Sequence, residues 1–92
     1  MERAGILVCV EEDKLRVVNS VRGETAKALE EAHRELLRSN KNYSCITYIV
    51  DSPWAWEQID CIKKCIGSYT SHSTNIVRSC IDKCRPAIRR LG

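Results

Sequence analysis

Four of the six cysteines form two pairs with the same spacing: Cys61 and Cys65 in "CIKKC", and Cys80 and Cys84 in "CIDKC". Thiols in this arrangement support three kinds of chemistry. They can form disulfide bonds, bind zinc as thiolates, or pack in the reduced state as small apolar side chains. The state of these cysteines also indicates the compartment of the protein, because disulfides persist in oxidising compartments and free thiols predominate in the cytosol.

A helical setting for both pairs favours one disulfide pattern. Residues four apart lie on the same face of a helix, about 6 Å apart along its axis. A short loop separates the two pairs, so the helices must be antiparallel. Only one pairing then keeps both bridges level, Cys61 with Cys84 and Cys65 with Cys80. Closing the inner loop of about 15 residues would stabilise the fold by roughly 3 kcal/mol.

Zinc is the main chemical alternative for these four cysteines. Their spacing falls within the C-x2–4-C range of structural zinc sites, and four thiolates from two helices could converge tetrahedrally. We expect no metal and no cofactor, with Cys61, Cys65, Cys80 and Cys84 as the ligands if the disulfides do not form. Cys9 and Cys45 lie in apolar segments, where a third bridge and two buried free thiols are equally compatible with the sequence.

The histidines do not extend this chemistry into a catalytic set. His33 lies at the edge of a helical apolar stripe and His72 in a polar loop, with no residue marked as an orienting third group. We therefore predict that the protein is not an enzyme.

Length and composition indicate one small globular domain, residues 1–92, with a marginal core. The chain is 43% hydrophobic and 29% charged, which argues against disorder. Its longest early apolar run, "AGILVCV", has about 7 residues where a membrane span needs about 20, so no membrane span is expected, and association of the basic residues with a membrane surface is only a weaker option.

The net charge of +3 is unevenly distributed. Residues 1–60 carry 8 Lys/Arg and 11 Asp/Glu, whereas residues 61–92 carry 7 Lys/Arg and one acid. The candidate anion-binding residues are Lys63, Lys64, Arg78, Lys83, Arg85, Arg89 and Arg90. Paired helices with basic outer faces could contact a nucleic-acid backbone without reading bases, although an ordinary solvated face is the alternative.

The first 52 residues predict a small antiparallel sheet with one covering helix. "GILVCV" and "LRVV" indicate a hairpin across residues 5–18, and "SCITYIV" (residues 44–50) a third strand that would bring Cys45 near Cys9. Between them, apolar residues from Val18 to Leu36 recur at helical spacing, and Ser39 and Asn40 would end this helix.

Residues 53–92 predict an antiparallel helical hairpin. Ser52 suits the N-cap and Pro53 the first turn of a helix that reaches Ile66. A second helix would begin at Ser73 or Thr74 and run through Arg85, where the following proline kinks or ends it. The predicted class is α+β, a sheet with a covering helix followed by a cysteine-braced hairpin.

The motif "WAW" offers a candidate interface anchor. Trp54 falls on the cysteine side of its helix, where it would join the core. Trp56 is rotated by roughly 200° from it. An exposed Trp56 would suit a protein interface, whereas packing against the sheet is the alternative.

The twin pairs in "CIKKCI" and "SCIDKC", followed by a basic tail, resemble those of the small TIM chaperones of the mitochondrial intermembrane space. The resemblance covers residues 54–92. It implies nested disulfides, assembly into rings and binding of hydrophobic precursor segments. If disulfides form, the expected location is that intermembrane space or the secretory route, and otherwise the cytoplasm or a host cell.

These observations favour a small, non-enzymatic, homo-oligomeric protein-binding module. The alternative is a basic protein that binds duplex nucleic acid or RNA without sequence preference, such as a viral suppressor of host defence.

Overall fold

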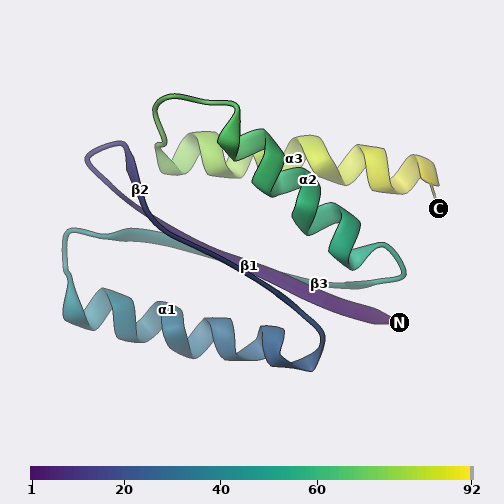
Figure 1. Ribbon diagram of the computed structural model, residues 1–92, viewed down its shortest axis with the longest axis horizontal. Helices are drawn as coiled ribbons and strands as arrows, with labels where there is room; N and C mark the ends of the chain where they lie inside the picture. The colour runs from purple at the N-terminus through teal and green to yellow at the C-terminus, as the bar shows by residue number, and fades with distance from the viewer. Residues whose placement is uncertain (92) are drawn as a thin grey trace.

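The computed structural model describes the backbone of residues 1–91 and the side chains of residues 1–85. The elements in chain order are β1 (Glu2–Glu11), β2 (Lys14–Arg22), the short 3-10 helix η1 (Glu24–Lys27), α1 (Ala28–Ser39), β3 (Ser44–Ser52), α2 (Ala55–Gly67) and α3 (Thr74–Leu91). Figure 1 shows the sheet between α1 on one side and α2 and α3 on the other. The predicted α+β class is confirmed, with the second face of the sheet covered by α2 and α3.

The sheet is antiparallel in the order β2-β1-β3. In the middle strand β1, Val8 pairs with Val18 of β2 and with Ile46 of β3. Cys9 lies opposite Cys45, as predicted for a third strand paired with the hairpin. Both neighbours of β1 are edge strands.

The β1–β2 connection is a tight turn at Glu12 and Asp13. Their φ angles are 52° and 62°, as in two-residue hairpin turns of type I′. The register shifts between Cys9 and Val10, because β2 holds one extra residue at this point. Such a bulge increases the local twist of the hairpin.

β2 is longer than the sequence indicated. It extends to Arg22, so Val18 and Val21 belong to a strand and their assignment to a helix was wrong. Pairing with β1 decided the outcome, because β-branched residues favour strands even where their spacing also fits a helix face. Gly23 follows at φ 99°, a conformation that favours glycine, and the chain turns there into η1.

α1 packs closely on the sheet at Gly5. A Cβ atom at this position would lie 3.0 Å from Leu29 Cδ1 and 3.2 Å from Ile49 Cγ1. The missing side chain of Gly5 therefore lets α1 approach β1. Leu29, Leu7 and Cys9 form the buried core of this face.

The larger core lies between the sheet and the helices α2 and α3. Its buried members alternate along β1 and follow the inner sides of both helices: Ala4, Ile6, Val8, Val10, Ala55, Ile59, Ile62, Ile66, Val77, Cys80, Ile81 and Cys84. Alternation in β1 therefore supplies apolar side chains to both faces of the sheet.

The start of α2 differs from the prediction. Ser52 is the last residue of β3, and its Oγ accepts a hydrogen bond from the Trp54 N–H at 3.2 Å, before the helix begins at Ala55. Ser52 therefore stabilises the turn and is not the N-cap, because pairing of β3 with Glu2 holds it in the sheet.

The predicted start of α3 is confirmed. The Ile76 N–H donates to Ser73 Oγ at 3.3 Å, the N-cap interaction. α3 continues past Pro86 to Leu91, so of the two predicted effects of this proline, a kink or an end, the end of the helix is excluded.

All six cysteines are paired. Cys9–Cys45 joins β1 to β3, whereas Cys61–Cys84 and Cys65–Cys80 join α2 to α3. The bridges between the helices are those that keep both pairs level. Three disulfides are compatible with an oxidising compartment.

We expect removal of Cys65–Cys80 by the double substitution Cys65→Ala and Cys80→Ala to lower the free energy of unfolding by about 3 kcal/mol. The cause is the additional freedom of the unfolded chain once a loop closed across 15 residues is opened. Denaturant unfolding of the oxidised protein measures the change. An oxidised variant with the same free energy of unfolding as the oxidised wild type would contradict the bridge.

Candidate functional site

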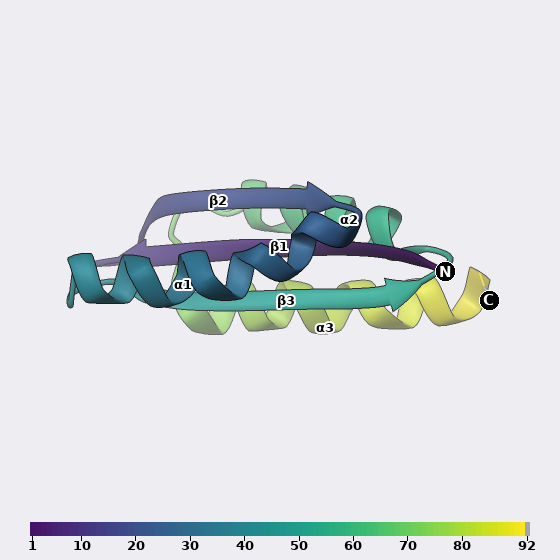
Figure 2. The same ribbon diagram turned by 90° about the horizontal axis from the view of Figure 1, so that it is seen from below.

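The outer edge of β2 is the most open part of the sheet. β2 has a hydrogen-bonded neighbour on one side only, since the strand order is β2-β1-β3. Figure 2 shows most of α1 lying over β1 and β3, with β2 beside it. β3 is also an edge strand, but Arg85 of α3 reaches over it to the ring of Tyr48.

The register of β1 identifies which backbone groups of β2 face outward. In antiparallel sheets, non-hydrogen-bonded pairs have Cα atoms about 4.5 Å apart and hydrogen-bonded pairs about 5.5 Å. Cys9 and Cys45 have Cα atoms 4.0 Å apart and are therefore a non-hydrogen-bonded pair. The N–H and C=O of Cys9 thus point away from β3, towards β2.

The alternation along β1 extends this assignment. Arg3, six residues before Cys9, also points towards β2, because its C=O accepts a hydrogen bond from Gly23 N–H at 2.6 Å. In β2 the residues opposite this set, Val17, Asn19 and Val21, bond to β1. The backbone groups of the intervening residues, Val18, Ser20 and Arg22, point out of the sheet.

The outward-facing residues of β2 place their side chains on the α2 side of the sheet. Val18 pairs with Val8, a member of the core beneath α2, and its own side chain is 43% exposed. At the end of the strand, the Arg22 guanidinium lies 5.8 Å from the centroid of the Trp56 ring. Arg22 also forms an ion pair with Glu2 at 3.1 Å.

One of the two tryptophans lies away from its expected place. Trp54 is 37% exposed, so its expected position in the core was wrong. It precedes the first turn of α2 and does not share the helical face that carries the cysteines. Trp56 is half-buried against the main core, and its backbone N–H donates to Glu2 Oε1 at 3.2 Å.

Lys63 also lies on the α2 side of this edge. It lies seven residues after Trp56, which is two turns of helix, so both face the same side of α2. Because Trp56 meets Arg22, this is the side that faces β2. Lys63 is exposed and forms no ion pair with any side chain in residues 1–85.

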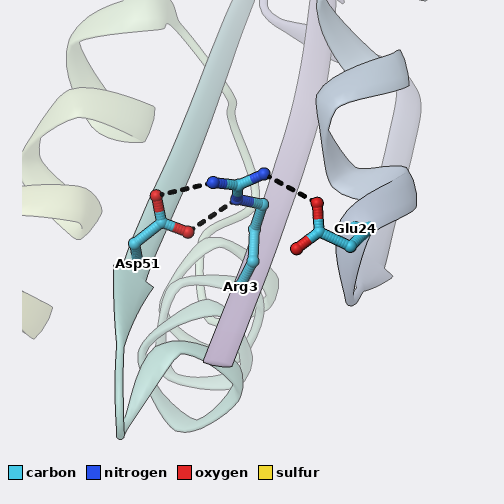
Figure 3. Close-up of polar contacts among 3 residues, drawn as sticks. All are labelled: Arg3, Glu24 and Asp51. Atoms are coloured by element: carbon cyan, nitrogen blue, oxygen red, sulfur yellow. Dashed lines mark hydrogen bonds and ion pairs between the residues drawn. The ribbon is translucent and has the colours of Figure 1, made fainter. Parts of the chain in front are cut away.

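An ion cluster on the opposite face fixes the end of the sheet (Figure 3). Arg3 donates two hydrogen bonds to Asp51 of β3, at 2.6 and 3.1 Å, and one to Glu24 of η1, at 3.0 Å. The hydrogen bond from Arg3, followed by its charge, lowers the pKa of Asp51 below its ordinary value. The same bond raises the pKa of Arg3.

Two other basic residues that the sequence singled out are held by local partners. Lys64 pairs with Asp60 at 2.9 Å. Lys83 donates to Tyr69 Oη at 3.1 Å.

Arg85 and Arg78 lie on a different side of the helices. The Arg85 guanidinium lies 5.4 Å from the ring centroid of Tyr48, and a hydrogen bond to this tyrosine raises the pKa of Arg85. Arg78 is exposed and lies seven residues before Arg85, which is two turns of helix, so both face the same side of α3.

The basic residues therefore do not share one face. Lys63 faces the β2 side and Arg85 the β3 side, at opposite edges of the sheet. The side chains of Arg89 and Arg90 lie outside the described residues. Nucleic-acid binding stays a prediction.

Both histidines have structural contacts. The His33 ring Nδ1 lies 2.8 Å from Thr47 Oγ1, which ties α1 to β3. His72 Nε2 donates to the Ile66 C=O at 3.0 Å, and its backbone N–H donates to the Asp13 C=O at 2.8 Å. His72 thus holds the α2–α3 loop against the β1–β2 turn.

Within the described part of the chain, no pocket and no metal-binding cluster of His, Cys, Asp or Glu is present. Every buried side-chain nitrogen or oxygen there has a hydrogen-bond partner. None of the helices over residues 1–91 has both the length and the apolar character to cross a bilayer. Comparisons with protein-family models, curated proteins and solved structures gave no match.

We expect Asp51→Asn to lower the stability at neutral pH, because it removes the charged partner of Arg3. The lowered pKa means that Asp51 contributes stability above its ordinary titration range, and the contribution is lost as pH falls through its folded pKa. The difference between wild type and variant should therefore shrink below about pH 4.

Thermal melting from pH 7 to pH 2 measures this difference. Glu35→Gln, a neutralised acid on α1, is the control and should leave the profile unchanged. If the melting temperatures of wild type and Asp51→Asn differed by the same amount at pH 7 and at pH 2, the stabilising role assigned to the Asp51 charge would be contradicted.

Proposed function

We propose that the protein is a non-enzymatic binding module that adds an extended segment of a partner protein to the edge of β2. The observation that carries this proposal is the outward direction of the backbone groups of Val18, Ser20 and Arg22. β-strand addition of this kind takes its affinity from main-chain hydrogen bonds and its specificity from alternate side chains.

The edge offers enough hydrogen bonds for such binding. Three outward residues supply one donor and one acceptor each, so an antiparallel segment could form up to about six bonds. Each bond contributes about 0.5–1.5 kcal/mol net, because water is displaced from both partners. Val18 adds an apolar contact on the α2 side, where its side chain is 43% exposed.

The rest of the molecule keeps this edge in shape. Cys9–Cys45 ties β1, the strand that supports β2, to β3, and the bridges between α2 and α3 brace the layer behind the sheet. A rigid edge binds more tightly because less conformational entropy is lost on binding. In this proposal the helical hairpin of residues 53–92 is a brace, and the protein works in an oxidising compartment.

The charge of this edge favours a different protein as the partner over a second copy of this chain. The charged residues of β2 are Lys14, Arg16 and Arg22, and none is acidic. Self-pairing would bring like charges together across the new strand pair, which is destabilising. Homo-oligomerisation stays a prediction, and it would use another surface.

Ser20→Pro tests the proposal. Proline removes an N–H that points out of the sheet, so the β1–β2 bonds remain, and an edge strand tolerates it there. We expect binding of segments selected from a displayed random-peptide library to fall about tenfold or more, because one bond is lost and the ring obstructs the incoming strand.

Ser20→Ala is the matched control, since it removes the hydroxyl and keeps the N–H. It should bind the selected segments as the wild type does. Circular dichroism and melting of both variants check that the fold is intact. Selected segments that bind Ser20→Pro and the wild type equally would overturn the proposal, as would a library that yields none.

A further inference from the structure

We infer that the segment bound at β2 is acidic: it presents carboxylates opposite Ser20 and Arg22 and an apolar side chain opposite Val18. This inference rests on the proposed addition to β2 and names the class of partner. The occupant is an extended acidic peptide segment of another protein.

The charge of the edge supports an acidic partner. The Arg22 side chain is 58% exposed even though it pairs with Glu2. Arg16, at the bulge, is 42% exposed and pairs with Glu11 at 3.3 Å. Both acids belong to β1, behind the edge, so an incoming strand meets the arginines first.

Lys63 adds a positive charge above the middle of the edge. It lies on the side of α2 that faces β2, two turns beyond Trp56. α2 runs antiparallel to β2, because the loop after α2 reaches the β1–β2 turn through the bond from His72 to Asp13. Moving along α2 from Trp56 to Lys63 therefore corresponds to moving back along β2 from Arg22 towards Val18.

The geometry of an antiparallel strand sets the order of residues in the segment. Residues opposite Arg22, Ser20 and Val18 are every second residue of the partner, and their side chains face α2. From its N-terminus the segment therefore has the order acidic, any, acidic, any, apolar.

A carboxylate opposite Ser20 is well placed between two cations. It lies diagonally from Arg22 across the strand pair, within reach of long side chains, and below the side of α2 that carries Lys63. Asp60 lies on the same side of α2 but is held in an ion pair of its own, at 2.9 Å, which leaves Lys63 as the unpaired charge there among the described side chains. Ser20 itself carries no charge. Val18 then receives the apolar residue, which extends the covered surface at the exposed valine.

Two labelled peptides test the inference with the oxidised full chain. One has the core Glu-Thr-Glu-Thr-Val and the other Lys-Thr-Lys-Thr-Val, each with neutral ends. Fluorescence anisotropy gives their dissociation constants. We expect the acidic peptide to bind at least about tenfold more tightly than the basic one, since two charge pairs are replaced by repulsion.

Lys63→Glu should weaken binding of the acidic peptide by about three- to tenfold and bring the two peptides closer in affinity. Lys41→Glu, an exposed lysine between α1 and β3, carries the same change of net charge and should leave both affinities unchanged. Equal effects of the two substitutions would show that net charge alone acts, and would overturn the inference.

The remaining outcomes separate this inference from the proposed function. If both peptides bind equally and Ser20→Pro abolishes both, strand addition stands and the acidic preference is overturned. If neither peptide binds while library-selected segments do so in a Ser20→Pro-sensitive manner, the acidic preference is again overturned. If the acidic peptide binds Ser20→Pro as tightly as the wild type, strand addition itself fails, and the inference with it.

Discussion

The burial of β1 on both faces is the constraint on which the rest of the fold depends. Seven consecutive residues, from Ala4 to Val10, are buried. A strand with no solvent-facing side needs an apolar layer on each face of its sheet. α1 supplies one layer, where the missing side chain at Gly5 lets it come close, and α2 with α3 supplies the other.

A middle strand also requires a neighbour on each side, and here the two neighbours differ. β3 is joined to β1 by a disulfide and lies beneath helices on both faces. β2 is the outer strand of the hairpin, and its charged residues are basic. The same packing that hides β1 thus leaves the outer edge of β2 free to form a further strand pair.

Much of the fold could be predicted from local patterns. Twin cysteine pairs at helical spacing indicated the bridges of α2 and α3, and apolar runs indicated three strands. The length of β2 could not be predicted, because Val18 and Val21 fit a helix stripe as well, and only pairing with β1 decides between them. The open edge was missed for the same reason. Its one local indication was a valine-rich run ending at Gly23. Charge counts placed the basic surface in the C-terminal third, but tertiary packing turned Lys63 and Arg85 to opposite sides.

The distribution of the bridges has a consequence for local opening. Each disulfide ties elements other than β2, which is held to β1 by hydrogen bonds, by a tight turn and by ion pairs at its ends. In hydrogen exchange, the amides of Val17, Asn19 and Val21 would report the opening of this strand alone, while those of β1 would report opening of the whole sheet. β2 would thus be the first strand to detach on gentle heating. A segment bound to its outer edge would slow the exchange of the amides that bond to β1, although it does not contact them.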